Sequence, residues 1–163
     1  MHSAHVDSFG REHLPPTEWQ PEFLFELPEL QFPAQLNCAT ELLDRHIEEG
    51  RGHRVCIRAP GLTWTYADLQ DKANRIANVL VHQMGLVPGN RVLLRAPNNP
   101  MLVACWLAIM KAGAIAVATM PLLRAKELKA IIDIGQVTHA LCDVALAEEL
   151  QLSAHEASPL RQV

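Results

Sequence analysis

The chain has 163 residues, of which 49% are hydrophobic, and this suits one ordinary domain of about 100 to 200 residues with its own core. Its formal net charge is −4 at pH 7, so it lacks the basic excess with which proteins bind the phosphates of nucleic acids. Composition and charge therefore exclude nucleic acid as an expected partner.

The first residues and the cysteines indicate the compartment. The opening sequence, MHSAHVDSFGREH, has no basic region followed by an apolar run, so it does not resemble a secretory signal. The four cysteines lie far apart in apolar or mixed segments, which favours reduced core thiols over disulfides. They are Cys38, Cys56, Cys105 and Cys142. We therefore expect a cytoplasmic protein.

Residues 1–35 have a composition of their own. They hold five of the eleven prolines, six acidic residues and one arginine, so their local charge is −5. The prolines forbid a long helix, yet the segment is too rich in aromatic residues for a typical disordered tail. We expect an irregular arm that packs onto another surface. Its aromatic residues are Phe9, Trp19, Phe23, Phe25 and Phe32.

Residues 36–163 form the predicted α/β part of the chain. From Leu36, apolar positions recur at intervals of three and four, which predicts a helix that Gly50 and Gly52 end. Residues 55–59 and 62–64 flank a Pro-Gly turn and predict a short hairpin. Strict alternation in its first strand would place Val55, Ile57 and Ala59 on one face.

A second helix is predicted between Thr65 and Gly85. Thr65 stands three residues before Asp68, a pattern in which each side chain satisfies a free backbone N–H group at the helix start. Gly85 ends the helix. Its apolar stripe comprises Tyr66, Leu69, Ala73, Ile76, Ala77, Leu80 and Met84.

The sequence RVLLRA, residues 91–96, predicts the next strand. In the loop after it, Asn99 is placed to cap a helix whose first residue is Pro100. That helix, residues 101–111, is apolar on every side. The run AIAVATM, residues 114–120, predicts a strand buried on both faces of a parallel sheet.

The last third of the chain continues the alternation. Residues 125–134 predict a helix, THALCD a strand, and residues 144–150 a short final helix. Helices that alternate with strands indicate an α/β fold with a doubly wound, mostly parallel sheet and flanking helices.

Residues 101–123 also contain a single charge in 23 positions, which raises the possibility of a membrane span. The segment Lys111-Ala112-Gly113 interrupts the run, and the apolar stretch before it is shorter than the about 20 residues that a span requires. A buried helix followed by a buried strand explains the pattern better, so we expect no membrane association.

Two groups of side chains are of types that can bind a metal or act as nucleophile and base. Cys38, His46, His53 and Cys56 are of the types that bind zinc, but their spacing lacks the close Cys pairs of zinc sites, and we expect no metal there. His139 and Cys142 fall in one strand at i and i+3, where side chains point to opposite faces, so we expect both to be core residues.

Two loops have residues of the kind that can bind a nucleotide or another anion. Gly50-Arg51-Gly52 follows a helix and lacks a third glycine, so it does not fit a dinucleotide loop, and no P-loop sequence occurs. Asn98-Asn99-Pro100 stands between a strand and a helix start, where anions can bind. Turn and capping roles explain these asparagines better.

Four stretches resemble the amino-terminal part of the adenylate-forming acyl-CoA ligases, and within them the benzoate and 2-aminobenzoate type. The leading segment VDSFGREHLPPTEWQPEF fits the 2-aminobenzoate branch in particular. The best-matched stretches are NCATELLDRH, TWTYADLQDKANRIANVL, RVLLRAPNNP and AGAIAVATMPLLRAKEL.

The resemblance implies a place in a large enzyme. Such ligases activate a carboxylate with ATP and Mg²⁺ to an acyl-adenylate, release pyrophosphate and transfer the acyl group to CoA. The matched stretches resemble scaffold of the first α/β subdomain, whereas a phosphate loop of the form [ST]-[ST]-G-[ST]-T-G-x-P-K and a carboxy-terminal lysine do the chemistry. That loop does not occur in the chain, and its four lysines fall in predicted helices. They are Lys72, Lys111, Lys126 and Lys129.

We therefore expect an amino-terminal fragment of an aryl-acid CoA ligase that is inactive alone, with no catalytic, cofactor-binding or metal-binding residue assigned. For this chain alone we expect no cofactor; aryl carboxylate, ATP and CoA bind only in a complete enzyme. The alternative is a non-catalytic interaction module derived from the same subdomain. In either case we expect self-association, because strands that are apolar on both faces and the all-apolar helix that begins at Met101 would leave apolar surface uncovered.

Overall fold

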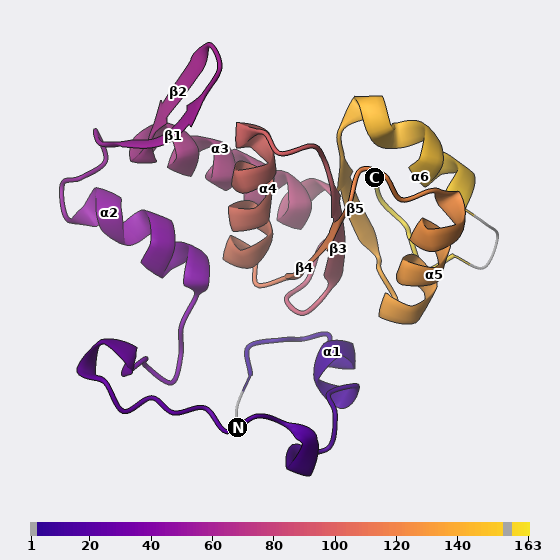
Figure 1. The fold of residues 1–163 in the computed structure, drawn as a ribbon, viewed down its shortest axis with the longest axis horizontal. Helices are drawn as coiled ribbons and strands as arrows, with labels where there is room; N and C mark the ends of the chain where they lie inside the picture. Colours follow the sequence, from indigo (N-terminus) through magenta and orange to yellow (C-terminus); the bar gives the residue numbers. More distant parts are fainter. Residues whose placement is uncertain (1–2, 155–157) are drawn as a thin grey trace.

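The centre of the molecule is a three-stranded parallel sheet (Figure 1). The computed structural model describes residues 3–154 and 158–163. The strands lie in the order β4-β3-β5, and both neighbouring pairs are parallel. The central strand β3 (Arg91–Arg95) is buried at every residue, and β4 (Ile115–Thr119) and β5 (His139–Cys142) flank it.

Helices cover both faces of this sheet (Figure 1). On one face lie α3 (Tyr66–Asn78) and α4 (Pro100–Lys111), and on the other lie α5 (Ala125–Gly135) and α6 (Ala147–Ser153). The helices alternate with the strands along the chain, and each connection between parallel strands includes a helix. The predicted doubly wound α/β fold is confirmed.

Alternation along β3 explains why both faces of the sheet are covered. Val92 and Leu94 point to one side and pack with Ile109 of α4. Leu93, between them, points to the other side and packs with Ile132 of α5. Because β3 is apolar on both faces, the sheet needs a helical layer on each side to exclude water from it.

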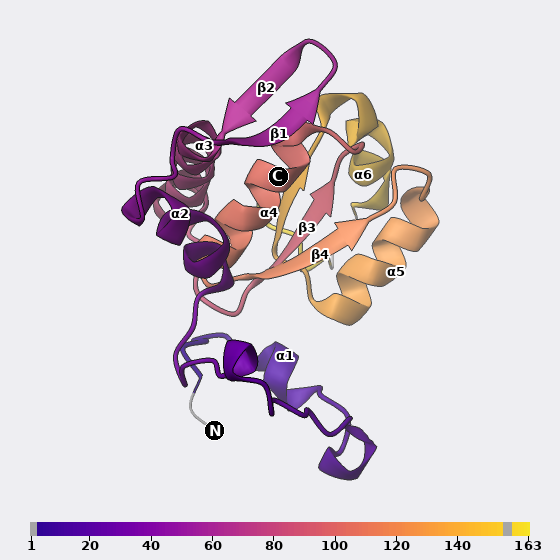
Figure 2. The same cartoon turned by 60° about the vertical axis from the view of Figure 1, so that its left-hand side comes forward.

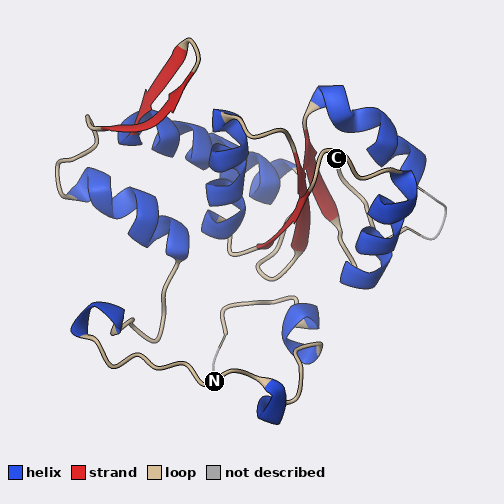
Figure 3. Cartoon of the chain, in the orientation of Figure 1, coloured by secondary structure: helices blue, strands red, loops and turns tan. Residues whose placement is uncertain are grey.

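An outer layer lies beyond α3 and α4, in addition to the sheet and the two helical layers that cover it (Figure 2). It comprises a π-helical turn (Thr40–Asp44), α2 (Arg45–Glu48) and an antiparallel hairpin of β1 (Val55–Ala59) and β2 (Leu62–Thr65). Figure 3 shows this hairpin separate from the parallel sheet. The core cluster that joins this layer to α3 and α4 contains Ala39, Leu43, Trp64, Leu69, Ala73, Ala77, Ala104, Leu107 and Ala108.

Both predicted helix caps are present. The hydroxyl oxygen of Thr65 accepts a hydrogen bond from the backbone N–H of Asp68 at 3.2 Å, and the Asp68 carboxylate accepts one from the backbone of Thr65 at 2.9 Å. The side-chain oxygen of Asn99 accepts from the backbone N–H of Leu102 at 2.9 Å, with Pro100 in the first turn.

The helix ends also follow the sequence closely. A π-helical turn, Val79–Gln83, extends α3 to Gly85, which has a φ of 68°. The predicted helix 125–134 corresponds to α5. The predicted final helix 144–150 is a 3₁₀ turn, Val144–Leu146, followed by α6.

Two details of the strand predictions are wrong. The strand expected to be buried on both faces, β4, is only half-buried, because among the described residues it pairs with β3 alone and lies at the edge of the sheet. In the hairpin, the pairing register shifts between Val55 and Ile57. This bulge leaves Val55 42% exposed, and Cys56 packs against the core beside Ile57 instead.

The apolar segment 101–123 folds as α4 followed by β4, with a sharp turn at Gly113 (φ 73°) between them. Among residues 3–154 and 158–163, no helix is long and apolar enough to cross a membrane.

Most of the acidic arm extends away from the rest of the molecule (Figure 2). It forms α1 (Phe9–Glu12) and 3₁₀ turns at Thr17–Trp19 and Pro28–Leu30, and every residue from 11 to 29 is exposed. Of its aromatic residues, Phe9 is half-buried against this chain. The others are exposed: Trp19 76%, Phe23 68%, Phe25 48% and Phe32 55%. The expectation that the arm packs onto another surface stays a prediction.

Candidate functional site at the carboxyl ends of the parallel strands

A hollow lies at the carboxyl ends of β3 and β5, where the chain leaves these two neighbouring strands toward opposite faces of the sheet. β3 leads into α4 on one face of the sheet, and β5 leads toward α6 on the other (Figure 1). Ligands of open α/β sheets bind at the carboxyl ends of two such strands. The hollow there measures about 290 Å³ and is lined by Leu94, Ala96, Asn99, Met101, Leu102, Cys105, Leu141, Cys142, Asp143 and Val144.

The polar side chains of this hollow are engaged within the chain. Asn99 caps α4, as described above. One carboxylate oxygen of Asp143 accepts from the backbone N–H of Ala145 at 3.0 Å, and the backbone N–H of Asp143 donates to the carbonyl oxygen of Arg95 at 2.8 Å. The predicted capping role of Asn99 is confirmed, and neither side chain is placed as an acid or base.

The thiols of the hollow are not activated. Burial raises the pKa of Cys105, and it raises the pKa of Cys142 against the opposing effect of the Arg95 charge. A thiol with a raised pKa is a poor nucleophile at neutral pH. His139 does not assist Cys142, because its ring nitrogens contact the carbonyl oxygen of Met84 at 3.0 Å and the hydroxyl of Thr138 at 2.8 Å.

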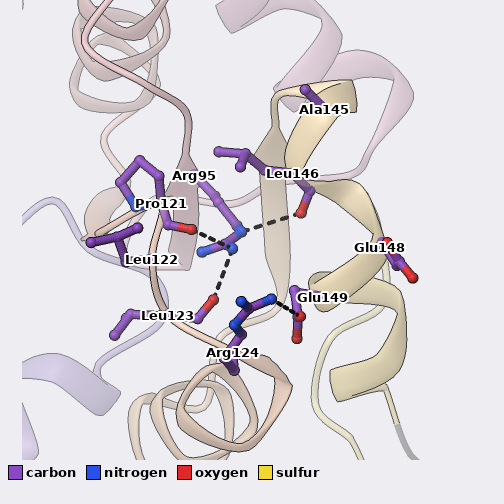
Figure 4. A pocket seen from close by; sticks show the side chains of 9 residues that line it. All are labelled: Arg95, Pro121, Leu122, Leu123, Arg124, Ala145, Leu146, Glu148 and Glu149. Atoms are coloured by element: carbon purple, nitrogen blue, oxygen red, sulfur yellow. Dashed lines mark hydrogen bonds and ion pairs between the residues drawn. The ribbon is translucent and has the colours of Figure 1, made fainter.

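Arg95 organises the loops at this end of the sheet (Figure 4). Its side chain is 1% exposed at the end of β3. The guanidinium group donates hydrogen bonds to four backbone carbonyl oxygens in the loops after β4 and β5. The acceptors are Met120 at 2.9 Å, Pro121 at 3.0 Å, Leu123 at 2.9 Å and Leu146 at 3.3 Å.

A second hollow, of about 210 Å³, lies beside Arg95 (Figure 4). An ion pair of 2.7 Å between Arg124 and Glu149 lies at its edge, and Glu149 also accepts from the backbone N–H of Ala125 at 2.8 Å. The Arg124 hydrogen bond, with that backbone contact, lowers the pKa of Glu149. Glu149 is therefore held as a carboxylate that fastens α5 to α6, and it is not suited to act as an acid at neutral pH.

The four candidate zinc ligands occupy separate settings. Nδ1 of His46 accepts a hydrogen bond from Arg51 at 3.0 Å, and the Cys56 thiol donates to the carbonyl oxygen of Trp64 at 3.5 Å. His53 and Cys38 are exposed. Within the described ranges, 3–154 and 158–163, no three His, Cys, Asp or Glu side chains lie close enough to hold a metal ion. The prediction that the protein binds no zinc stays a prediction.

The lysines lie in helices, as predicted, and at least three have structural partners, among them Lys129, whose ammonium group is 2.7 Å from a carboxylate oxygen of Asp133. The ammonium group of Lys111 is 2.6 Å from the carboxylate of Asp44. That of Lys72 lies 4.8 Å from the ring centre of Trp64. Lys126 and Lys129 lie in α5. Gly50, from the rejected glycine loop, has a φ of 75° and ends the first predicted helix.

Comparison with known proteins identifies the fold. The family model described as AMP-binding enzyme matches residues 43–162. Acetyl-coenzyme A synthetase from Streptomyces avermitilis is 38% identical over 85 residues, which are 49% of this chain and 13% of that protein.

Two solved structures superpose with a TM-score of 0.70 each. An anthranilate CoA ligase in complex with anthranoyl-AMP is 22% identical and is matched over 77% of this chain and 24% of its own. A benzoate CoA ligase from Burkholderia xenovorans LB400 is 21% identical, and the match covers 78% of this chain and 25% of that ligase. The chain thus spans about a quarter of these structures, and at these low identities the superposition shows a shared fold alone.

Proposed function

We propose that this chain, which belongs to the AMP-binding enzyme family, provides the first α/β scaffold of a ligase that activates an aryl carboxylate with ATP and transfers the acyl group to CoA. The observation that supports the aryl class is the superposition on the anthranilate and benzoate CoA ligases over 77% and 78% of the chain. The resemblance of the arm segment VDSFGREHLPPTEWQPEF to the 2-aminobenzoate branch points the same way.

The scaffold role follows from the state of the polar groups at the strand ends. Adenylation requires cationic and N–H donors that are free to meet phosphate oxygens. Arg95 instead binds backbone carbonyls, while Asn99 and Asp143 accept from backbone N–H groups. We therefore assign to this chain the positioning of loops, and to residues outside it the contacts with ATP, Mg²⁺ and CoA.

Acetate is the competing substrate. Sequence relatives include acetyl-coenzyme A synthetase, at 38% identity over 85 residues. That match covers 49% of this chain, so it bears on the shared α/β scaffold, and we give more weight to the arm and to the structural neighbours.

The scaffold role is tested by ATP–pyrophosphate exchange with the isolated chain. We predict that exchange with benzoate, 2-aminobenzoate or acetate equals the rate without any acid. Exchange that depends on one of the acids and disappears in the Arg95→Met variant would show that the chain itself adenylates.

A non-catalytic interaction module is the second candidate, favoured by exposed apolar side chains on α4 and the arm. Trp106 and Met101 of α4 are 40% and 46% exposed, and Trp19 is 76% exposed. Apolar side chains that gather on a surface mark interfaces. Antibody capture of the native protein separates the two candidates: copurification with acid-dependent exchange activity supports the ligase, and an inactive complex supports the module.

A further inference from the structure

The arm contacts the body of the protein at the amino end of β3, where two backbone hydrogen bonds converge. The N–H groups of Val6 and Asp7 each donate to the carbonyl oxygen of Pro88 at 2.9 Å. Figure 1 shows this part of the arm, with α1, beside the lower end of the sheet. Residues 11–29, which follow this contact and are called the tether below, are all exposed. They therefore do not hold the arm against the body.

The contact is completed by a buried charge of the body. Arg91 is 6% exposed and donates to the carbonyl oxygens of Gly135 at 3.0 Å, Gln136 at 2.6 Å and Gly89 at 3.1 Å. These acceptors are neutral, and the Asp7 carboxylate, which forms an ion pair with Arg91, supplies the negative charge. The Asp7 carboxylate thus adds a charge-assisted hydrogen bond to a guanidinium whose other acceptors are neutral, and such bonds are stronger than those between neutral groups.

The arm segment fits Arg91 with two kinds of group. The Asp7 carboxylate also accepts from the side-chain N–H of Asn90 at 2.8 Å and from the backbone N–H of Phe9 at 3.0 Å. The ring centre of Phe9 lies 4.7 Å from the guanidinium carbon, in cation–π contact. Acid and ring therefore bind the same guanidinium, and their spacing in the sequence, Asp-x-Phe, is set by this geometry.

Glycines on both sides permit the close approach. Gly89 has a φ of 91°, and a Cβ at that position would overlap the carbonyl oxygen of Asp7. A Cβ on Gly10 would lie 2.9 Å from Cδ1 of Ile115. A larger residue at position 89 would push the arm away from the strands, whereas at position 10 the Ile115 side chain would have to shift.

The other end of β3 provides a contrast. Arg95 is equally buried, but its four hydrogen-bond acceptors all belong to body loops. Arg91 instead receives its counter-charge from Asp7, which is 84 positions away in the sequence and is connected to the body through an exposed tether.

We propose that residues 88–91 form a recognition site for an Asp-x-Phe segment, and that Asp7 and Phe9 occupy it as a releasable latch. Release of the latch frees the arm at this end, because every residue from 11 to 29 that follows it is exposed. The vacated site then accepts the same Asp-x-Phe chemistry from a separate peptide.

Hydrogen exchange of the full chain tests the latch. In Asp7→Asn, the amides of Val6 and Asp7 should exchange at least about tenfold faster, because a charge-assisted hydrogen bond of the usual strength is lost. Glu18→Gln, which removes an equal charge from the exposed tether, should leave exchange unchanged. Equal acceleration in both variants, or none in Asp7→Asn, would overturn the proposal.

A labelled peptide with the sequence of residues 4–13 tests recognition. Its fluorescence anisotropy should rise with the full-length Asp7→Asn chain at concentrations at least about tenfold lower than with the wild type, whose site is filled. A peptide with asparagine in place of the aspartate should not bind. Binding that ignores this aspartate, or that is equal for both chains, would refute the site. If circular dichroism shows that Asp7→Asn unfolds the chain, Phe9→Ala replaces it in both experiments, with the same expected results.

Discussion

The ammonium nitrogen of Lys111 lies 2.6 Å from a carboxylate oxygen of Asp44 and 2.6 Å from the side-chain oxygen of Asn74. These contacts join α4 to α3 and to the π-helical turn before α2. The Lys111 and Asp44 side chains are only 20% and 16% exposed. The ion pair therefore fastens the outer layer that contains α2 to the helices α3 and α4, which cover one face of the sheet.

Asp44→Asn should lower the free energy of unfolding by about 1–3 kcal/mol, because it leaves the ammonium group partly buried without its counter-charge. Urea denaturation measures the change. The matched variant Asp71→Asn disrupts an exposed pair with Arg75, whose side chains are 55% and 77% exposed, and should cost less than about 1 kcal/mol. Equal losses in the two variants would show that the buried pair has no special role.

Arg95→Met should destabilise the chain by about 2–4 kcal/mol, since it leaves carbonyl oxygens of two loops without donors. Hydrogen exchange should accelerate in residues 120–124 and 143–146 and stay unchanged in α3. Arg75→Met, at an exposed position, serves as the control. Unchanged exchange in those loops would mean that Arg95 does not hold them.

Asn99→Ala should cost about 1 kcal/mol, the usual contribution of a helix cap. Asn98→Ala, one residue earlier in the exposed bend, should change stability by less than about 0.5 kcal/mol. Thermal unfolding of the two variants side by side makes the comparison, and a larger loss from Asn98 would contradict the assigned cap.

The latch should open in acid. Burial alone would raise the pKa of Asp7, but hydrogen bonds from Arg91, Phe9 and Asn90 and the charge of Arg91 outweigh it and hold the pKa below its usual value. A lowered pKa stabilises the folded state fully above the unfolded value of about 3.9, and this contribution is lost as the pH falls through the folded pKa. The titratable or charged residues that neighbour the latch in the sequence are His5, Arg11, Glu12 and His13.

Exchange of the Val6 and Asp7 amides, corrected for the intrinsic effect of pH, should therefore be constant from pH 7 to about pH 5 and accelerate below about pH 4. Asp7→Asn removes the titrating group and should show no such step. A step of equal size in the variant would assign it to another carboxylate.

The exposed apolar residues favour association at high concentration. Light scattering after size exclusion should show a mass above 18.1 kDa that grows with concentration. Replacement of Trp19 and Phe23 by glutamine should reduce the effect if the arm is responsible. A constant monomer mass at all concentrations would contradict the expectation of self-association.

Local sequence signals predicted the architecture well. The capping pair of Thr65 and Asp68 and the cap at Asn99 depend on residues three positions apart, so their geometry is visible in the sequence. The alternation of helices and strands likewise predicted the doubly wound sheet.

Features set by distant partners were not predicted. Arg91 and Arg95 are the two ends of an otherwise apolar strand. A charged residue in a buried strand needs partners, and this was the one sequence signal that both arginines have structural roles. Apart from Gly89, which accepts from Arg91, their hydrogen-bond partners lie 25 to 84 residues away, and nothing local identifies them. The bulge at Val55 and the half-buried state of β4 also depend on which strands pair, which periodicity does not determine.

The proposed function is tested most directly by the acid dependence of ATP–pyrophosphate exchange in the protein captured from its native cells with an antibody against residues 36–163. We predict exchange that is faster with 2-aminobenzoate or benzoate than with acetate. Exchange that is fastest with acetate, or none with any of the three acids, would contradict the assignment to an aryl-acid ligase.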